Sequence, residues 1–92
     1  MLYSIMSQST FRASKAAGLA AFSSCNWQAA KASYLEASTT VGASTTDTSI
    51  CLCNAAACCL KLAEFEEAER LAGEALDANP GYVKALYRRA QV

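Results

Sequence analysis

Apolar and small residues recur along this chain at three- and four-residue intervals, which is the spacing of one face of an α-helix. From Phe65 onward, for example, Ala68, Ala72 and Ala75 lie along one side of a helix. No segment alternates apolar and polar residues as a half-buried strand would. The pattern predicts an all-α protein with five helices, at residues 9–24, 27–39, 48–62, 65–78 and 82–92.

Turn signals separate these helices. The Asn-Pro-Gly sequence at 79–81 ends one helix, because proline cannot continue it and glycine relieves the turn that follows. In the stretch 38–48, seven of eleven residues are Ser or Thr. This stretch is predicted to be an extended loop that ends at an N-cap formed by Thr46 or Asp47. Residues 1–8 are predicted to be frayed or to add a partial turn.

The predicted helices form an internal repeat. A shift of the chain that places Trp27 on Phe65 also superimposes other small and aromatic positions: Gly18 on Ala56, Ala30 on Ala68, Tyr34 on Ala72 and Ala37 on Ala75. A slightly shorter shift does the same further along, with Leu52 on Leu86 and Ala56 on Ala90. Two helix pairs and the first helix of a third are therefore expected. The aromatic side chains are expected in the core, namely Trp27, Tyr34 and Phe65.

These helix pairs resemble tetratricopeptide repeats (TPRs) across residues 9–92. The resemblance implies a right-handed α-solenoid of helix-turn-helix repeats, with repeat one at 9–39, repeat two at 48–80 and a half repeat at 82–92. Phe65 is expected to fill the turn between the helices of repeat two. The sequence contains neither the second helix of the third repeat nor the polar capping helix that such arrays carry. The chain is therefore expected to be part of a longer protein.

Composition restricts the chemistry that this chain could perform. Its 92 residues include eight Lys or Arg and eight Asp or Glu but no histidine. With so few basic residues, nucleic-acid binding is not expected. No glycine-rich phosphate loop, acid/base pair of carboxylates or activated nucleophile can be assembled, so we predict no catalytic residues and no cofactor, and the chain is not expected to be an enzyme. No apolar run reaches the ~18 residues of a membrane span, so no membrane partner is expected.

Four of the five cysteines lie in the predicted helix 48–62. Only Cys51 and Cys58, two turns apart, share a face of that helix. Because one helix cannot supply a tetrahedral set of ligands and no second Cys/His cluster exists, no metal site is predicted. These cysteines are expected to be reduced core residues, which implies a reducing, cytoplasmic environment. Cys25 lies in the first predicted turn, where exposure is expected and no base accompanies it.

The resemblance also implies a ligand groove, because TPR arrays line their concave face with the first helix of each repeat. The residues expected to face this groove are Lys15, Leu19, Phe22, Ile50, Cys53, Asn54, Ala57, Lys61, Lys84 and Arg88. Six of the eight acids lie elsewhere, between Glu64 and Asp77. A groove of Lys and Arg suits carboxylates, which Arg can hold through two parallel hydrogen bonds.

Four of these residues match the dicarboxylate-clamp subclass of TPRs, namely Lys15, Asn54, Lys84 and Arg88. Leu19 stands where that subclass has a further asparagine, which helps to hold the terminal carboxylate. Members of the subclass bind the free C-terminus of cytosolic heat-shock chaperones, which ends Glu-Glu-Val-Asp. The resemblance therefore implies a co-chaperone-type adaptor that binds such a peptide through Lys15, Leu19, Phe22, Asn54, Lys61, Lys84 and Arg88.

Two other functions remain open from the sequence. The run KALYRRA at 84–90 is similar to the corresponding run in large immunophilin-type peptidyl-prolyl isomerases. The chain is then the TPR portion of an isomerase whose catalytic domain lies outside these residues. Alternatively, the helices form a structural TPR scaffold that binds another partner by helix packing or through an internal peptide.

Overall fold

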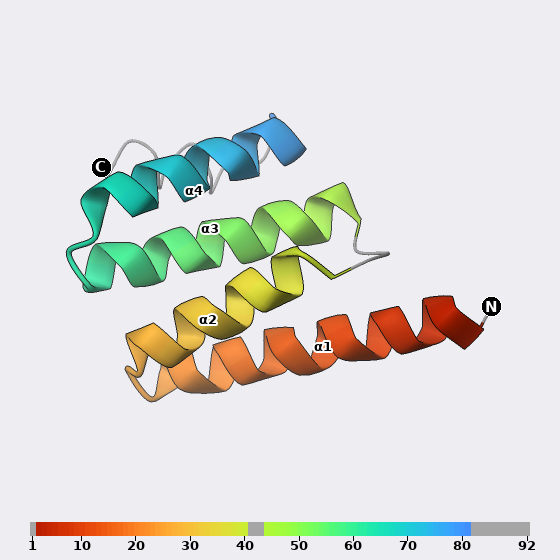
Figure 1. Ribbon diagram of the computed structural model, residues 1–92. Helices are drawn as coiled ribbons and strands as arrows, with labels where there is room; N and C mark the ends of the chain where they lie inside the picture. The colour runs from red at the N-terminus through yellow and green to blue at the C-terminus, as the bar shows by residue number, and fades with distance from the viewer. Residues whose placement is uncertain (1, 41–43, 82–92) are drawn as a thin grey trace.

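The structure is a computed structural model that describes residues 2–40 and 44–81, with side chains from Thr10 onward. Four helices make up these residues, and no strand occurs among them: α1 (Leu2–Ser23), α2 (Trp27–Ser38), α3 (Thr45–Lys61) and α4 (Phe65–Ala78). The all-α prediction is confirmed. The helix predicted at 82–92 lies outside the described residues. Each helix packs against the next in chain order, and successive helices run in opposite directions (Figure 1).

Within each helix pair, the two helices are joined by a turn, and the two turns have the same geometry. Cys25 and Ala63 each have a φ of 59°, the left-handed conformation that commonly ends a helix. The next amide in each turn donates back to the preceding helix over 2.8 Å, from Asn26 N to Ala21 O and from Glu64 N to Cys59 O. Ala63 follows Cys25 by the same interval that was predicted from the sequence, so the backbone repeats together with the packing positions.

Small residues form most of the core. Alanines with no exposed surface occur in α2, α3 and α4, and they let the helix axes approach closely. The predicted core cysteines are confirmed as buried and form no disulfide among the described residues, while Cys25 is exposed. Burial raises the pKa of the Cys51 and Cys59 thiols to about 11, so both stay protonated near neutral pH. Buried Ser49 joins α3 to α4 by donating from its Oγ to the Ala75 carbonyl over 2.8 Å.

Helix α1 approaches α2 closely at Gly18. A Cβ atom added there would lie 2.9 Å from Cε1 of Tyr34 and 3.0 Å from two further atoms of the same ring. Tyr34 is only 3% exposed, so its ring has little room to retreat. Glycine is therefore required at this crossing for steric reasons. The sequence repeat had already placed Gly18 and Tyr34 at packing positions, and the structure puts them in contact.

Two predicted boundaries were wrong. Helix α1 begins at Leu2 rather than at residue 9, since residues 2–8 contain neither glycine nor proline to stop a helix extending toward the N-terminus. Helix α3 begins at Thr45, and its N-cap is Ser44, not Thr46 or Asp47. The Ser44 Oγ accepts a hydrogen bond of 3.0 Å from the Asp47 amide. The Ser/Thr-rich loop is correspondingly shorter than predicted.

The prediction of an aromatic core was correct for Tyr34 and wrong for Phe65. Phe65 is 55% exposed and does not fill the turn between α3 and α4. Trp27, its counterpart in the first helix pair, is half-buried because Phe22 and Lys61 lie against its ring. Lys61 belongs to α3, the first helix of the following pair. Within the described part of the chain no following pair exists to cover Phe65.

Candidate functional site

A pocket of about 290 Å³ opens between α1, α2 and α3. Helix α1 supplies most of its lining through four residues spaced i, i+3, i+4 and i+7, which therefore form one stripe on its surface. Helices α2 and α3 contribute one residue each. The described residues that line it are Arg12, Lys15, Ala16, Leu19, Tyr34 and Asn54.

The polar side chains of this pocket are mostly hydrogen-bond donors. Arg12 and Lys15 are cations, Asn54 carries an amide and Tyr34 a phenol, and no carboxylate of the described residues lines the pocket. Within residues 10–40 and 44–81, none of these four side chains makes a hydrogen bond or ion pair with another residue. Lys15 does lie over the Phe11 ring, with Nζ 5.9 Å from the centroid, which holds its stem beside the pocket. Such a set of free donors suits an anion.

Three of the predicted site residues meet here. Lys15 and Asn54 face the pocket from α1 and α3, and Leu19 forms part of its apolar wall. Leu19 is 60% exposed and so adds accessible apolar surface to the pocket wall. The combination of cations, an amide and an apolar wall is typical of small-molecule and peptide sites.

Other predicted residues lie outside the pocket lining. Phe22 packs edge-on against Trp27, with ring centroids 4.9 Å apart at 75°, and Lys61 Nζ lies 5.6 Å from the Trp27 centroid. The remaining groove candidates of α3 do not line the pocket either: Cys53 and Ala57 are buried in the core, and Ile50 is half-buried. The predicted residues Lys84 and Arg88 lie outside the described part of the chain.

Sequence reasoning missed two lining residues. Arg12 lies three residues before Lys15 and so on the same face of α1, a signal that the periodicity contained. Tyr34 was assigned to the core because its aromatic ring occupies a packing position. The ring is indeed buried, but the residue also lines the pocket. A core assignment by itself does not say where the hydroxyl group of a tyrosine goes.

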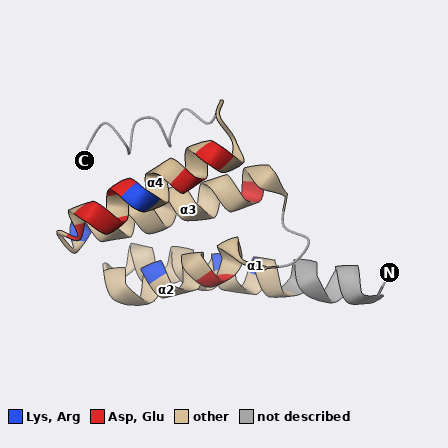
Figure 2. Ribbon diagram, turned by 45° about the horizontal axis from the view of Figure 1, so that its top comes forward, with Lys and Arg blue, Asp and Glu red and all other residues tan. Residues whose placement is uncertain are grey.

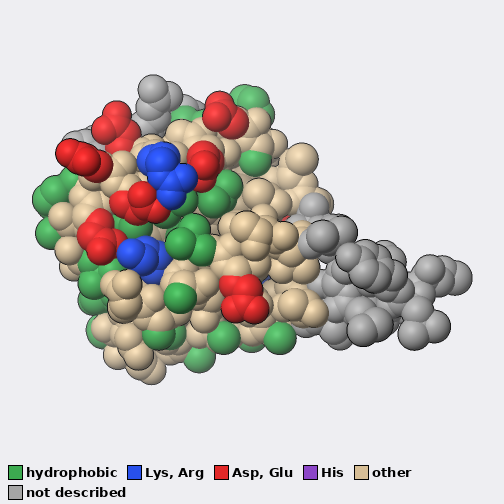
Figure 3. Space-filling model, in the orientation of Figure 1, with side chains coloured by type: hydrophobic (Ala, Val, Ile, Leu, Met, Phe, Trp, Pro, Cys, Tyr) green, Lys and Arg blue, Asp and Glu red, His purple; other side chains and the backbone are tan. Residues whose placement is uncertain are grey.

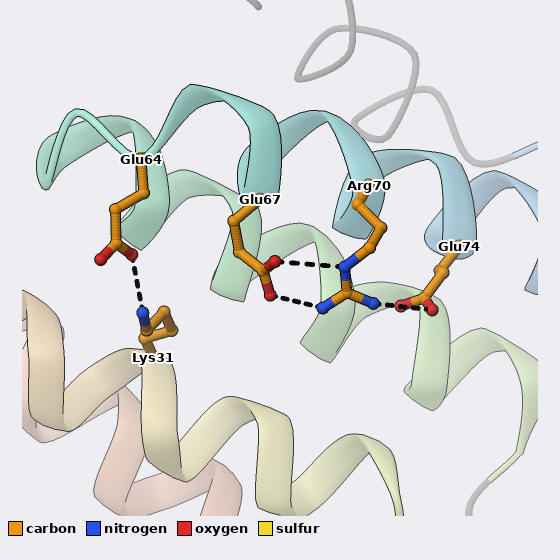
Figure 4. Close-up of polar contacts among 5 residues, drawn as sticks. All are labelled: Lys31, Glu64, Glu67, Arg70 and Glu74. Atoms are coloured by element: carbon orange, nitrogen blue, oxygen red, sulfur yellow. Dashed lines mark hydrogen bonds and ion pairs between the residues drawn. The ribbon is translucent and has the colours of Figure 1, made fainter.

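A second hollow, of about 710 Å³, lies at the start of α4 and is lined by Lys31, Ala63, Glu64, Phe65, Glu66 and Glu67. Its charges are largely neutralised internally. Lys31 Nζ contacts Glu64 Oε1 at 2.6 Å, and Arg70 bonds both Glu67 and, at 3.0 Å, Glu74 (Figure 4). These contacts raise the pKa of Lys31 and lower the pKa of Glu67.

The two concave regions therefore differ in charge. Acidic residues crowd α4, whereas the described part of α1 carries cations and no acid (Figure 2). On the face shown in Figure 3, red side chains surround the blue side chain that lies over α4. The second hollow is larger, but it already pairs its cations with carboxylates. The pocket between α1, α2 and α3 keeps its donors free, so we regard it as the candidate site.

No three or more Cys, Asp or Glu side chains in residues 10–40 and 44–81 are grouped so that they could hold a metal ion. None of the four helices combines the length and the apolarity that crossing a bilayer requires. No protein-family model and no solved structure matches this chain.

Proposed function

We propose that this chain is a TPR-type interaction module whose pocket between α1, α2 and α3 binds the free carboxyl terminus of an acidic peptide, such as that of a heat-shock chaperone. The observation that carries this proposal is the convergence of Lys15 and Asn54 with Arg12 on one pocket, to which the described part of the chain brings no carboxylate. The matching turns at Cys25 and Ala63, which end the first helix of each pair, support the repeat assignment. The choice of a chaperone peptide rests on the sequence resemblance.

The energetics of this pocket favour a modest, salt-dependent affinity. A well-formed hydrogen bond to a charged group contributes about 1.5–3 kcal/mol, so two or three such bonds contribute about 3–9 kcal/mol, from which the entropic cost of association is subtracted. Arg12 is exposed and Lys15 only half-buried. Dissolved ions screen such charges over about 8–10 Å at physiological ionic strength. We therefore expect affinity to fall as salt is raised.

The proposal predicts a preference for a free carboxylate. A peptide ending in Glu-Glu-Val-Asp should bind the 92-residue chain about tenfold more tightly than the same peptide with a C-terminal amide, because the amide removes a negative charge and an acceptor. Isothermal titration calorimetry at two salt concentrations measures both affinities. Equal affinity for the two peptides contradicts the proposal and favours a scaffold that binds its partner by helix packing.

A further inference from the structure

Tyr34 is almost fully buried, yet its hydroxyl group has no partner within the described residues. Only 3% of the residue is exposed. Among the residues that the structure describes, no side-chain oxygen or nitrogen is both sealed from solvent and without a hydrogen bond. Because the Tyr34 hydroxyl makes no hydrogen bond there, it must reach the accessible surface. The concave surface that Tyr34 lines is the pocket.

The rest of the phenol is held in place by packing. Its ring lies against Gly18 of α1, so closely that a Cβ atom on Gly18 would come within 2.9 Å of Cε1. A buried ring that cannot move aside gives its hydroxyl a nearly constant position relative to the pocket that Tyr34 lines. Burial also raises the pKa of Tyr34, and the nearby Cys58 and Cys51 raise it further. The phenol therefore remains a neutral donor across the physiological pH range.

From this arrangement we infer that the Tyr34 hydroxyl donates a hydrogen bond to the ligand's carboxylate, in company with Lys15 and Asn54. The inference rests on the proposed function and adds a specific donor from α2 to a site otherwise formed by α1 and α3. A preorganised hydroxyl costs little conformational entropy on binding, in contrast to the long side chains of Arg12 and Lys15. Tyr34 thus links the packing of the first helix pair to recognition of the ligand.

The substitution Tyr34→Phe tests this role, because it removes the hydroxyl and keeps the ring that packs on Gly18. We expect the affinity for the peptide acid to fall about tenfold, the usual effect of losing a hydrogen bond to a charged group. The melting temperature should change little. Ser24→Ala serves as control, since it removes an exposed hydroxyl that lies outside the pocket lining; its affinity should equal that of the unmodified chain.

A second measurement on the unmodified chain does not depend on the folding of a variant. With tyrosines labelled by ¹³C at Cζ, the assigned Tyr34 resonance should shift when the peptide acid is added and stay nearly unchanged with the peptide amide. If the chain prefers acid over amide but Tyr34→Phe binds as tightly as the unmodified chain and the resonance does not move, the role of Tyr34 is wrong while the proposed function stands. If acid and amide bind equally, the proposed function itself is wrong.

Discussion

Replacing Gly18 by alanine is expected to lower the free energy of unfolding by up to about 2 kcal/mol, because overpacking outweighs the gain in helix propensity. In a helix interior this exchange normally stabilises by about 1 kcal/mol, since alanine restricts the unfolded chain. Here the new methyl group would meet the Tyr34 ring at 2.9 Å. Overpacking of this kind costs about 1–3 kcal/mol when the neighbour cannot move, and Tyr34 is buried.

Gly73→Ala provides a matched control in α4. No atom lies within 4 Å of a Cβ added at Gly73, so only the propensity gain applies, and the free energy of unfolding should rise by about 1 kcal/mol. Urea denaturation followed by circular dichroism measures both variants. The two substitutions should change stability in opposite directions. Stabilisation of similar size by both would contradict the close contact of α1 with α2.

The largest effect on binding is expected for Lys15→Glu. This change removes one of the two cations that the described residues bring to the pocket and places a carboxylate in the lining that Lys15 shares with Asn54, where it repels the ligand's own carboxylate. We expect affinity for the peptide acid to fall about 30-fold or more, which corresponds to about 2 kcal/mol. The change should also reduce the difference in affinity between peptide acid and peptide amide, because the acid loses more affinity than the amide does. Calorimetric titration of both peptides measures this difference directly.

Lys61→Glu is the control for charge. It makes the same charge change on α3, but Lys61 lies over the Trp27 ring and does not line the pocket. Its effect on affinity should stay within about twofold at physiological salt, where the charge is screened. Equal losses for Lys15→Glu and Lys61→Glu would mean that the ligand responds to overall charge and not to this pocket.

Much of the fold could be predicted because helix pairs of this kind depend on local signals. Small residues at 30, 37, 68 and 75 marked the buried faces correctly. The repeat that relates Trp27 to Phe65 was visible in packing positions, and the turn dihedral angles at Cys25 and Ala63 recur with the same interval. The start of α1 and the cap of α3 were not predictable with the same accuracy, because several adjacent residues can begin a helix equally well.

The candidate site was predictable only in part. Lys15 and Leu19 could be assigned to one face because they lie four residues apart on one helix, and Asn54 was added to them by the resemblance to the TPR groove. Whether Lys61 and Phe22 faced the same pocket depended on how Trp27 packs between the two helix pairs. That packing is a tertiary contact without a local signal. The same holds for Phe65, whose exposure follows from the absence of a covering helix pair among the described residues.

The location of the bound peptide tests the central claim most directly. In a ¹H–¹⁵N correlation spectrum of the labelled chain, titration with the peptide acid should shift the amide resonances of residues 12–19 and of those around Tyr34 and Asn54. The amides that border the acidic hollow at Phe65 should stay unchanged, since carboxylates already line that hollow. Shifts centred on Phe65 and its neighbours in α4, or no shifts at all, would contradict a carboxylate site between α1, α2 and α3.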